Sequence, residues 1–276
     1  MNGVMLAMFG ILVLSGPNAL SQRTPSSRTP RTLVAVLAHA DDEAPVAPIL
    51  ARYARDGDRV FMLIVSDGGA GTGQQGTIPR PDSAPQGEAL VRQRAEEARC
   101  AAQVLGIQPP IQLGFPDGKL GDYAGDRTLI FRLTQQVAQE LARLKPDAVL
   151  TWGPDGGFGH PDHRIVSNVV TQLQRAGAPG VPDRVFYMYL PDEAIRAMNP
   201  QRGAPPFTIP QAKYFTVRVP FSASDLDAAG RSMSCHRSQY TAETVQRVVP
   251  AMGRIWNGEI ALVPAFVGAS GKDVFR

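Results

Sequence analysis

Histidines and carboxylates cluster at two places in this sequence. The chain has only four histidines. One opens the segment His39-Ala40-Asp41-Asp42-Glu43, and two more lie in His160-Pro161-Asp162-His163. Two imidazoles and one carboxylate, with a fourth position open to water, are the donor set of hydrolytic zinc sites. The clustering therefore predicts a metal-dependent hydrolytic site rather than scattered core or surface histidines.

The spacing within each segment supports convergence on one ion. His160 and His163 are three residues apart at the expected start of a helix, where such positions share a face. His39 and Asp42 bracket a tight turn that leaves a strand. A metal-activated water needs a group that takes its proton, and Asp41, next to the expected ligand Asp42, is the candidate general base.

The segments around these residues resemble the motifs of the PIG-L/LmbE-like deacetylases. The first corresponds to that family's His-Pro-Asp-Asp-Glu motif, and Gly157 to His163 corresponds to its second motif. Weaker matches follow in the family's order, and together they span about residues 32–240. These matches are Arg94-x-x-Glu97, Phe115-Pro116-Asp117-Gly118 and His236-Arg237-Ser238-Gln239.

The resemblance implies a Rossmann-like fold and a zinc-dependent hydrolase that removes an N-acyl, typically N-acetyl, group from an amino-sugar substrate. It implies His39, Asp42 and His163 as zinc ligands and Asp41 as general base. His160, either protonated or acting as a hydrogen-bond donor, would stabilise the oxyanion or assist departure of the amine. Residues expected to contact the substrate or to support the ligands are Arg94 and Asp117 near the sugar, Asp162 orienting a neighbouring histidine, and His236.

Two residues depart from the family pattern. Ala40 replaces the usual proline, which removes no chemical group. Phe158 stands where some members have a tyrosine whose hydroxyl assists the carbonyl. Loss of one such donor costs on the order of a hundredfold in rate, so His160 and the metal would carry more of the oxyanion stabilisation.

Apolar runs alternating with helical patterns predict an α/β fold. Short continuous runs of apolar residues indicate buried strands, and apolar residues recurring every three to four positions indicate helices. The alternation predicts a mostly parallel sheet with helices on both faces, in a single domain over residues 32–276. Ligands bind beyond the carboxyl ends of such strands, where both histidine segments lie. The predicted strands are 33–38, 60–65, 111–113, 148–152, 185–190 and 214–219; the predicted helices are 88–105, 127–144, 161–175 and one from Ser222 or Ser224 to 239.

Charge and composition exclude other classes. Residues 1–31 contain three arginines and no acidic residue, so the remainder of the chain has equal numbers of acidic and basic residues. This argues against a nucleic-acid partner, which requires clustered Lys and Arg. The Gly-rich segment 66–71 lacks the lysine of a phosphate-binding loop and is interpreted as a loop shaping the pocket rim.

The N-terminal segment predicts export. The apolar run at residues 4–14 is too short for a stable membrane span and suits the core of a signal peptide over residues 1–21. Residues 22–31 have the composition of a linker. No basic residue precedes the run and three arginines follow it, so a cytoplasmic location is the alternative. Cys100 and Cys235 either pair in an oxidising compartment or remain free thiols.

Other functions fit parts of the pattern. A metal-dependent amidase or esterase on another glycoconjugate would use the same chemistry, and iron or cobalt would fit the same donors. A carbohydrate-binding module of the same fold would lack a ligand or the base, and neither is missing. A Ser-His-Asp hydrolase is disfavoured because there is no Gly-x-Ser-x-Gly segment. The loops 71–87 and 191–212 would select the substrate, and no pattern indicates an oligomeric state.

Overall fold

The computed structural model describes residues 28–71, 84–191, 193, 209–266 and 268–276. The predicted signal peptide, most of the predicted linker and much of the two predicted substrate loops lie outside these residues. Within the described part of the chain, no helix has the length and apolar character needed to cross a bilayer.

The described strands form one seven-stranded sheet in the order β3-β2-β1-β4-β5-β7-β6. The first five strands are parallel, and β7 runs antiparallel to both β5 and β6. This confirms the predicted mostly parallel sheet. The strands are β1 (Thr32–Leu37), β2 (Arg59–Ser66), β3 (Ile111–Phe115), β4 (Ala148–Trp152), β5 (Val185–Met188), β6 (Val217–Pro220) and β7 (Glu259–Pro264).

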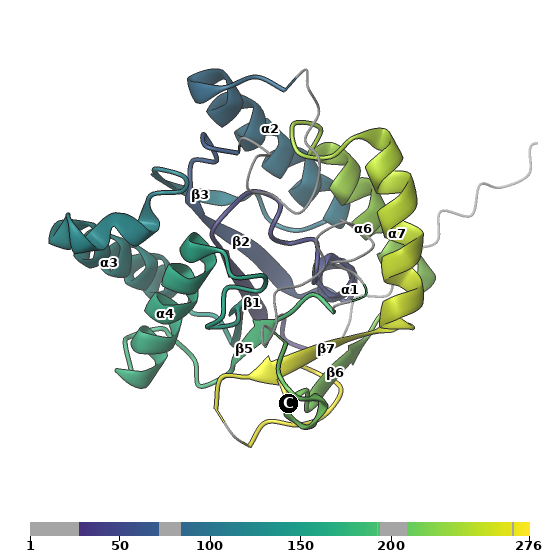
Figure 1. Cartoon of the computed structure of the whole chain (residues 1–276). Coiled ribbons are helices and arrows are strands. Elements are labelled where there is room, and N and C mark those ends of the chain that lie inside the picture. Colours follow the sequence, from purple (N-terminus) through teal and green to yellow (C-terminus); the bar gives the residue numbers. More distant parts are fainter. Residues whose placement is uncertain (1–27, 72–83, 192, 194–208, 267) are drawn as a thin grey trace, which may run out of the picture.

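Helices cover both faces of the sheet (Figure 1). One buried apolar cluster joins the sheet to α1, α2, α6 and α7, and a second joins it to α3 and α4. β1 contributes alternate residues to the two clusters, with Leu33 on one side and Val34 on the other, because successive strand residues point to opposite faces. The helices are α1 (Ala47–Arg55), α2 (Gly87–Leu105), α3 (Arg127–Leu144), α4 (Pro161–Arg175), α6 (Ala223–Cys235) and α7 (Ala242–Trp256).

The strand order reverses between β1 and β4. From β1 the chain moves outward through β2 to β3, then returns to place β4 on the other side of β1. In open parallel sheets this switch point leaves a crevice at the carboxyl ends of the two strands. The segment that begins at His39 follows β1, and the segment that ends at His163 follows β4, so the topology brings the two histidine segments together.

Three elements escaped prediction, namely α1, α7 and β7. Pro250 lies inside α7 and Pro48 lies in the first turn of α1, and prolines read as breaks in a helical pattern. The helix predicted from Ser222 to residue 239 ends at Cys235 instead, because the chain turns there through a His236 cap. β6 begins at Val217, since residues 212–214 form a short 3-10 helix.

A disulfide joins Cys100 in α2 to Cys235 at the end of α6. The bond spans 135 residues of sequence. Of the two alternatives open from the sequence, pairing or free thiols, the structure has the pair. It ties together two helices on the same face of the sheet, directly before the turn that carries His236.

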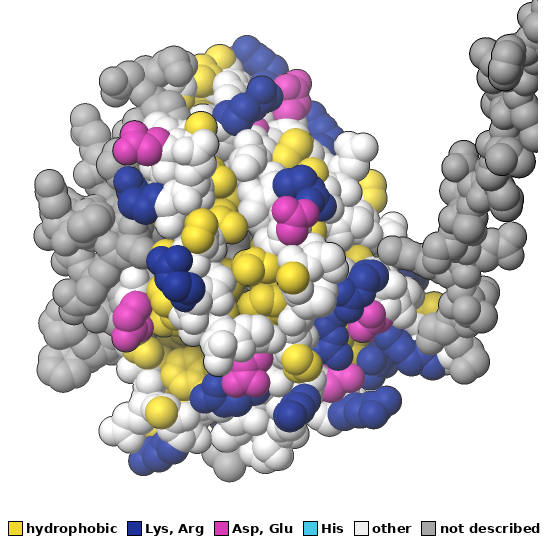
Figure 2. Space-filling model, turned by 90° about the vertical axis from the view of Figure 1, so that its right-hand side faces the viewer, with side chains coloured by type: hydrophobic (Ala, Val, Ile, Leu, Met, Phe, Trp, Pro, Cys, Tyr) yellow, Lys and Arg dark blue, Asp and Glu magenta, His cyan; other side chains and the backbone are white. Residues whose placement is uncertain are grey.

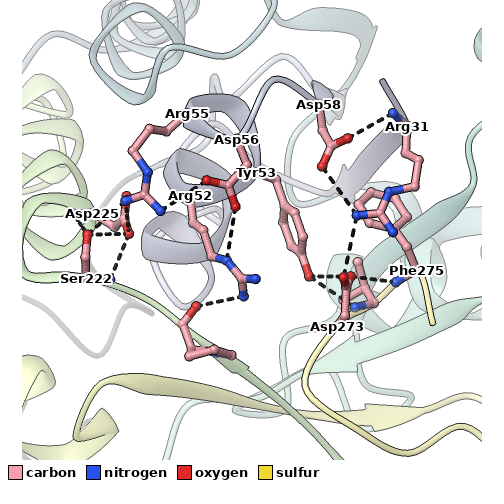
Figure 3. A network of polar contacts seen from close by, with 12 residues as sticks. Arg31, Arg52, Tyr53, Arg55, Asp56, Asp58, Ser222, Asp225, Asp273 and Phe275 are labelled. Atoms are coloured by element: carbon pink, nitrogen blue, oxygen red, sulfur yellow. Dashed lines mark hydrogen bonds and ion pairs between the residues drawn. The ribbon is translucent and has the colours of Figure 1, made fainter. Parts of the chain in front are cut away.

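A polar network closes the opposite, amino edge of the sheet (Figure 3). Asp58, whose side chain is 0% exposed, accepts two hydrogen bonds from the Arg28 guanidinium and one from the backbone N–H of Arg31. Asp273 near the C-terminus accepts from the Tyr53 hydroxyl, 3.2 Å away. Arg28 and Arg31, at the end of the predicted linker, are therefore attached to the folded part of the chain.

One face of the molecule carries both signs of charge (Figure 2). In the face shown in Figure 2, acidic and basic side chains are interspersed around short apolar strips. Arg55 of α1 pairs with Asp225, the residue that also completes the capping box of α6 with Ser222. The ion pair thus connects the ends of two helices on the same face of the sheet.

The buried Asp58 carboxylate provides a test of this edge. We expect Asp58→Asn to reduce the free energy of unfolding by about 1–3 kcal/mol, because it leaves buried donors poorly matched. Urea denaturation measures the change. The control Asp122→Asn removes an exposed carboxylate that, among the described residues, pairs with Lys119 alone, and should change stability by less than about 0.5 kcal/mol. Equal losses of stability in the two variants would contradict a stabilising role for the Asp58 contacts.

Candidate active site

The histidine segments meet at the carboxyl ends of β1 and β4. His39 and His163 are buried, at 7% and 1% exposure. Asp41 and His160 are only partly buried. The expected ligands His39 and His163 are therefore enclosed. Asp41 and His160, which are expected to transfer or donate protons, remain partly accessible from solvent.

Each of the two buried histidines directs one ring nitrogen toward the other. Nδ1 of His163 lies 3.1 Å from the Gly156 carbonyl, which can only accept, so this nitrogen carries the ring proton. Nε2 of His39 lies 3.0 Å from Asp117 and 3.4 Å from Asp162, both carboxylates, so it too carries a proton. The remaining nitrogens, Nδ1 of His39 and Nε2 of His163, are 3.1 Å apart.

Asp42 supplies the third donor. Its Oδ2 accepts hydrogen bonds from the backbone N–H groups of Ala38 and His39, at 2.9 and 2.8 Å. Its Oδ1 lies 3.0 Å from Nε2 of His163. Oδ2 is thus held by the turn after β1 and lies 3.6 Å from Nδ1 of His39, whereas Oδ1 faces His163.

This donor set fits a divalent cation. Two lone pairs facing each other across 3.1 Å repel unless a proton or a cation lies between them. Donors about 2.0–2.1 Å from a tetrahedral zinc are about 3.3 Å from one another, close to the 3.1 and 3.0 Å that separate His163 Nε2 from His39 Nδ1 and from Asp42 Oδ1. Burial lowers the pKa of His39, but Asp42, Asp117 and Asp162 outweigh burial and raise it well above its usual value. The site therefore favours positive charge.

His160 caps α4 and stacks on His163. Its Nδ1 accepts from the backbone N–H of Asp162, and the two imidazole centroids are 4.6 Å apart. Burial and the neighbouring histidines lower the pKa of His160 to about 4. The ring is therefore neutral near pH 7, with its proton on Nε2. His160, His39 and His163 also offer three nitrogens within 4.8 Å of one another.

Aromatic rings pack behind the second segment. Trp152 stacks on His163 with centroids 4.7 Å apart and ring planes 5° from parallel. Phe158 lies edge-on to His163 at 5.3 Å. The aromatic packing fixes the His163 ring, and Phe158 contributes an apolar surface where a tyrosine would contribute a hydroxyl.

Asp41 is held through both carboxylate oxygens. Arg94 Nη2 donates to Oδ1 at 2.6 Å, and the Tyr240 hydroxyl donates to Oδ2 at 3.1 Å. Burial, Asp41 and Glu43 raise the pKa of Tyr240 well above its usual value, so the phenol retains its proton. Tyr240 escaped prediction, although it directly follows the matched segment that ends at Gln239.

Arg94 lies beneath the Gly-rich loop that follows β2. It is 3% exposed, and a side chain at Gly68 or Gly71 would approach its atoms within 2.8 or 2.9 Å. The glycines therefore allow the backbone to pack on the guanidinium. Arg94 contacts Asp41 and the carboxylate of Asp117, rather than its helix neighbour Glu97.

Asp162 connects three segments of the site. Its Oδ2 accepts from the backbone N–H of Gly118 at 2.8 Å, and its Oδ1 accepts from that of Leu120 at 3.2 Å. With the contact to His39, this buried carboxylate joins the turns after β1 and β3 to α4. Asp162 lies 3.4 Å from His39, and its role of orienting that ring stays a prediction.

His236 lies behind the first segment, at 1% exposure. Its Nε2 is 2.7 Å from Glu43, which also accepts from the Ser232 hydroxyl. Burial lowers the pKa of His236, but Glu43 outweighs it and raises the pKa. His236 thus supports the segment from behind, and Glu43 is a buried supporting residue to which sequence reasoning assigned no role.

The order and geometry of these segments agree with a known family. Residues 34–174 match the PIG-L family, described as GlcNAc-PI de-N-acetylase. The chain belongs to the PIG-L family. The match contains both histidine segments and the elements from β1 to most of α4, so it covers the proposed ligands and Asp41 but not Tyr240.

Two bacterial proteins illustrate the likeness within the PIG-L family. The chain is 26% identical over 273 residues to 1D-myo-inositol 2-acetamido-2-deoxy-alpha-D-glucopyranoside deacetylase 2 of Catenulispora acidiphila, covering 85% of this chain and 88% of that protein. It is 28% identical over 274 residues to the 1D-myo-inositol 2-acetamido-2-deoxy-alpha-D-glucopyranoside deacetylase of Kineococcus radiotolerans, covering 83% and 74%.

Solved structures share the fold at lower identity. N,N'-diacetylchitobiose deacetylase from Pyrococcus horikoshii aligns with a TM-score of 0.60 and 15% identity, over 85% of this chain and 83% of its own. GalB, the 4-carboxy-2-hydroxymuconate hydratase of Pseudomonas putida KT2440, aligns at 0.55 and 18%, over 88% and 99%. Deacetylases and a hydratase thus share this architecture, so the fold alone does not determine the reaction.

The carboxylate of Asp162 provides a test of the metal centre. We expect Asp162→Asn to weaken zinc binding by about 10–100-fold, because an amide cannot accept from His39 and both backbone N–H groups as the carboxylate does. Competition with a chromogenic chelator measures the affinity. Asp122→Asn, on the exposed side of the adjacent turn, is the control and should bind zinc as the unmodified chain does. Unchanged affinity in Asp162→Asn would contradict the supporting role.

Proposed function

We propose that this chain is a zinc-dependent deacetylase that hydrolyses the N-acetyl amide of a 2-acetamido-2-deoxy sugar. The convergence of His39 Nδ1, Asp42 Oδ1 and His163 Nε2 beside the partly exposed Asp41 carries the proposal. Two imidazoles and one carboxylate are a typical catalytic zinc set. Membership of the PIG-L family supports amide hydrolysis over the hydration chemistry that the same fold also supports.

The chain's own residues supply the proton transfers. A divalent ion, when bound, lowers the pKa of a water molecule and polarises the amide carbonyl. Asp41 is the base that accepts the proton of the attacking water and then delivers it to the departing amine. The neutral His160 donates from Nε2 to the carbonyl oxygen as negative charge develops there. Asp117 and Asp162 keep the His39 proton on Nε2, so that Nδ1 remains a donor to the ion.

The names of similar proteins support the substrate class. The two bacterial relatives are named for a 2-acetamido-2-deoxy-glucopyranoside of inositol. The similar Pyrococcus structure is named for N,N'-diacetylchitobiose. Both compounds carry an acetylated amine on carbon 2 of the sugar, and we propose that this unit is the part of the substrate that reacts here.

The test is release of acetate. We expect the zinc-loaded chain to release acetate from at least one member of a panel of N-acetylglucosamine, N,N'-diacetylchitobiose and N-acetylglucosaminyl-inositol. Asp41→Asn should lower kcat by about 10²–10⁴-fold because it removes the proton acceptor. Elemental analysis should find about one metal ion per chain, as a single donor set predicts.

Matched controls separate catalysis from folding. Asp227→Asn changes an exposed carboxylate on α6 and should leave kcat unchanged. Asp41→Asn should retain its metal, because Asp41 is not among the proposed ligands. Metal binding without acetate release from any panel member would contradict the proposed substrate class, and failure to bind zinc would contradict the metal centre itself.

We also propose that the chain acts outside the cytoplasm. The apolar run at residues 4–14 and the Cys100–Cys235 disulfide support export, since such bonds persist mainly in oxidising compartments. Expressed from its first residue in a bacterial host, the protein should be recovered from the exported fraction with both cysteines resistant to a thiol-alkylating reagent. Recovery from the cytosol with two reactive thiols would contradict export.

A further inference from the structure

The turn after α6 presents Tyr240 to Asp41 from a rigid base. Backbone N–H groups of Gln239 and Tyr240 both donate to the His236 carbonyl at 2.9 Å. Ser238 donates to Glu97 of α2 from its backbone N–H and its hydroxyl, at 2.8 and 2.7 Å. The disulfide attaches the residue before His236 to the same helix. The turn is therefore attached to α2 on both sides of His236.

Both hydrogen-bond donors of Asp41 belong to this assembly. Arg94 lies one helical turn before Glu97 on α2, and Tyr240 lies two residues after Ser238. Glu97 is 2% exposed and accepts both bonds from Ser238. The shared support fixes the distance between the guanidinium and the phenol, and so defines the position of the carboxylate between them.

The two donors contact different oxygens of Asp41. Arg94 on Oδ1 alone leaves the carboxylate free to rotate about its Cβ–Cγ bond. Tyr240 on Oδ2 removes that rotation, because the plane must satisfy both contacts. Each carboxylate oxygen has a further lone pair, so Asp41 retains a site for the proton of water.

We propose that Tyr240 is a positioning residue, whose hydroxyl fixes the plane of the Asp41 carboxylate for proton transfer. The proposal rests on the proposed function in assigning Asp41 as the base. It does not require Tyr240 to contact the substrate or the ion. Removal of the hydroxyl should therefore slow the chemical step without weakening substrate or metal binding.

The kinetic test compares Tyr240→Phe with a matched control in the zinc-loaded full chain, using the panel substrate that the unmodified chain deacetylates fastest. Tyr240→Phe should lower kcat about tenfold, the effect of one hydrogen bond to a charged group, with KM and zinc content within about twofold of the unmodified chain. Tyr53→Phe removes the same kind of phenol–aspartate bond, of 3.2 Å, at the amino edge of the sheet, and should leave kcat unchanged.

A double substitution separates positioning from direct contact. If Tyr240 acts only through Asp41, Tyr240→Phe should have less than a twofold further effect in the Asp41→Asn background. A kcat within twofold of the unmodified chain for Tyr240→Phe would overturn the proposal. So would a raised KM at unchanged kcat, or a full tenfold effect retained in Asp41→Asn, since both would indicate contact with the substrate.

Thermal unfolding tests the proposal independently of turnover. A phenol bonds more strongly to a carboxylate than to a neutral amide. Tyr240→Phe should lower Tm by about 2–4 °C in the unmodified background, and by less than half as much in Asp41→Asn. Equal losses in the two backgrounds would overturn the contact. Absence of acetate release by the unmodified chain would count against the proposed function alone, because the thermal comparison would still decide the role of Tyr240.

Discussion

The close approach of two imidazole nitrogens is the constraint that organises this protein. His39 Nδ1 and His163 Nε2 lie 3.1 Å apart, and each faces the other because the opposite ring nitrogen donates elsewhere. Such an arrangement is unfavourable without positive charge between the rings. The negative charge of Asp42 favours a cation there; one of its oxygens faces His163, while the backbone after β1 holds the other. The sheet topology, with β4 beside β1, brings the two distant histidine segments together.

Buried carboxylates around the histidines serve different purposes although they are chemically alike. Asp117 and Asp162 determine which nitrogen of His39 carries a proton, and Asp162 also joins the turns after β1 and β3 to α4. Glu43 faces away from the centre and pairs with His236. Only Asp41 remains partly exposed while bonded to neutral and cationic donors. The surroundings of each carboxylate, rather than its residue type, decide whether it supports a histidine or can accept a proton.

The helical layer containing α2 and α6 explains how distant sequence reaches the centre. The disulfide, the Glu97–Ser238 contacts and the Arg94–Asp41 ion pair lie along α2 at successive turns. The Cys100–Cys235 disulfide is thus connected to Asp41 through the contacts of Glu97 and Arg94. At the opposite edge, the contacts of Asp58 and Asp273 attach both ends of the described chain to the sheet. Contacts along α2 at the carboxyl edge of the sheet and contacts of Asp58 and Asp273 at its amino edge therefore both hold the segments around the site.

The sequence by itself predicted a metal-dependent hydrolytic site and located most of the elements. The donor types, their spacing and the order of the motifs predicted the site, and apolar runs, apolar periodicity and Gly or Pro boundaries located β1 to β5 and α2 to α4, because these signals are local. Only the tertiary structure decided which groups those residues contact. Tyr240 on Asp41 and the pairing of Cys100 with Cys235 depend on α2 and α6 packing together. Arg94 beneath a glycine loop depends on α2 packing beside the turn after β2. Contacts between residues far apart in the sequence leave no periodic pattern, so only folding brings them together.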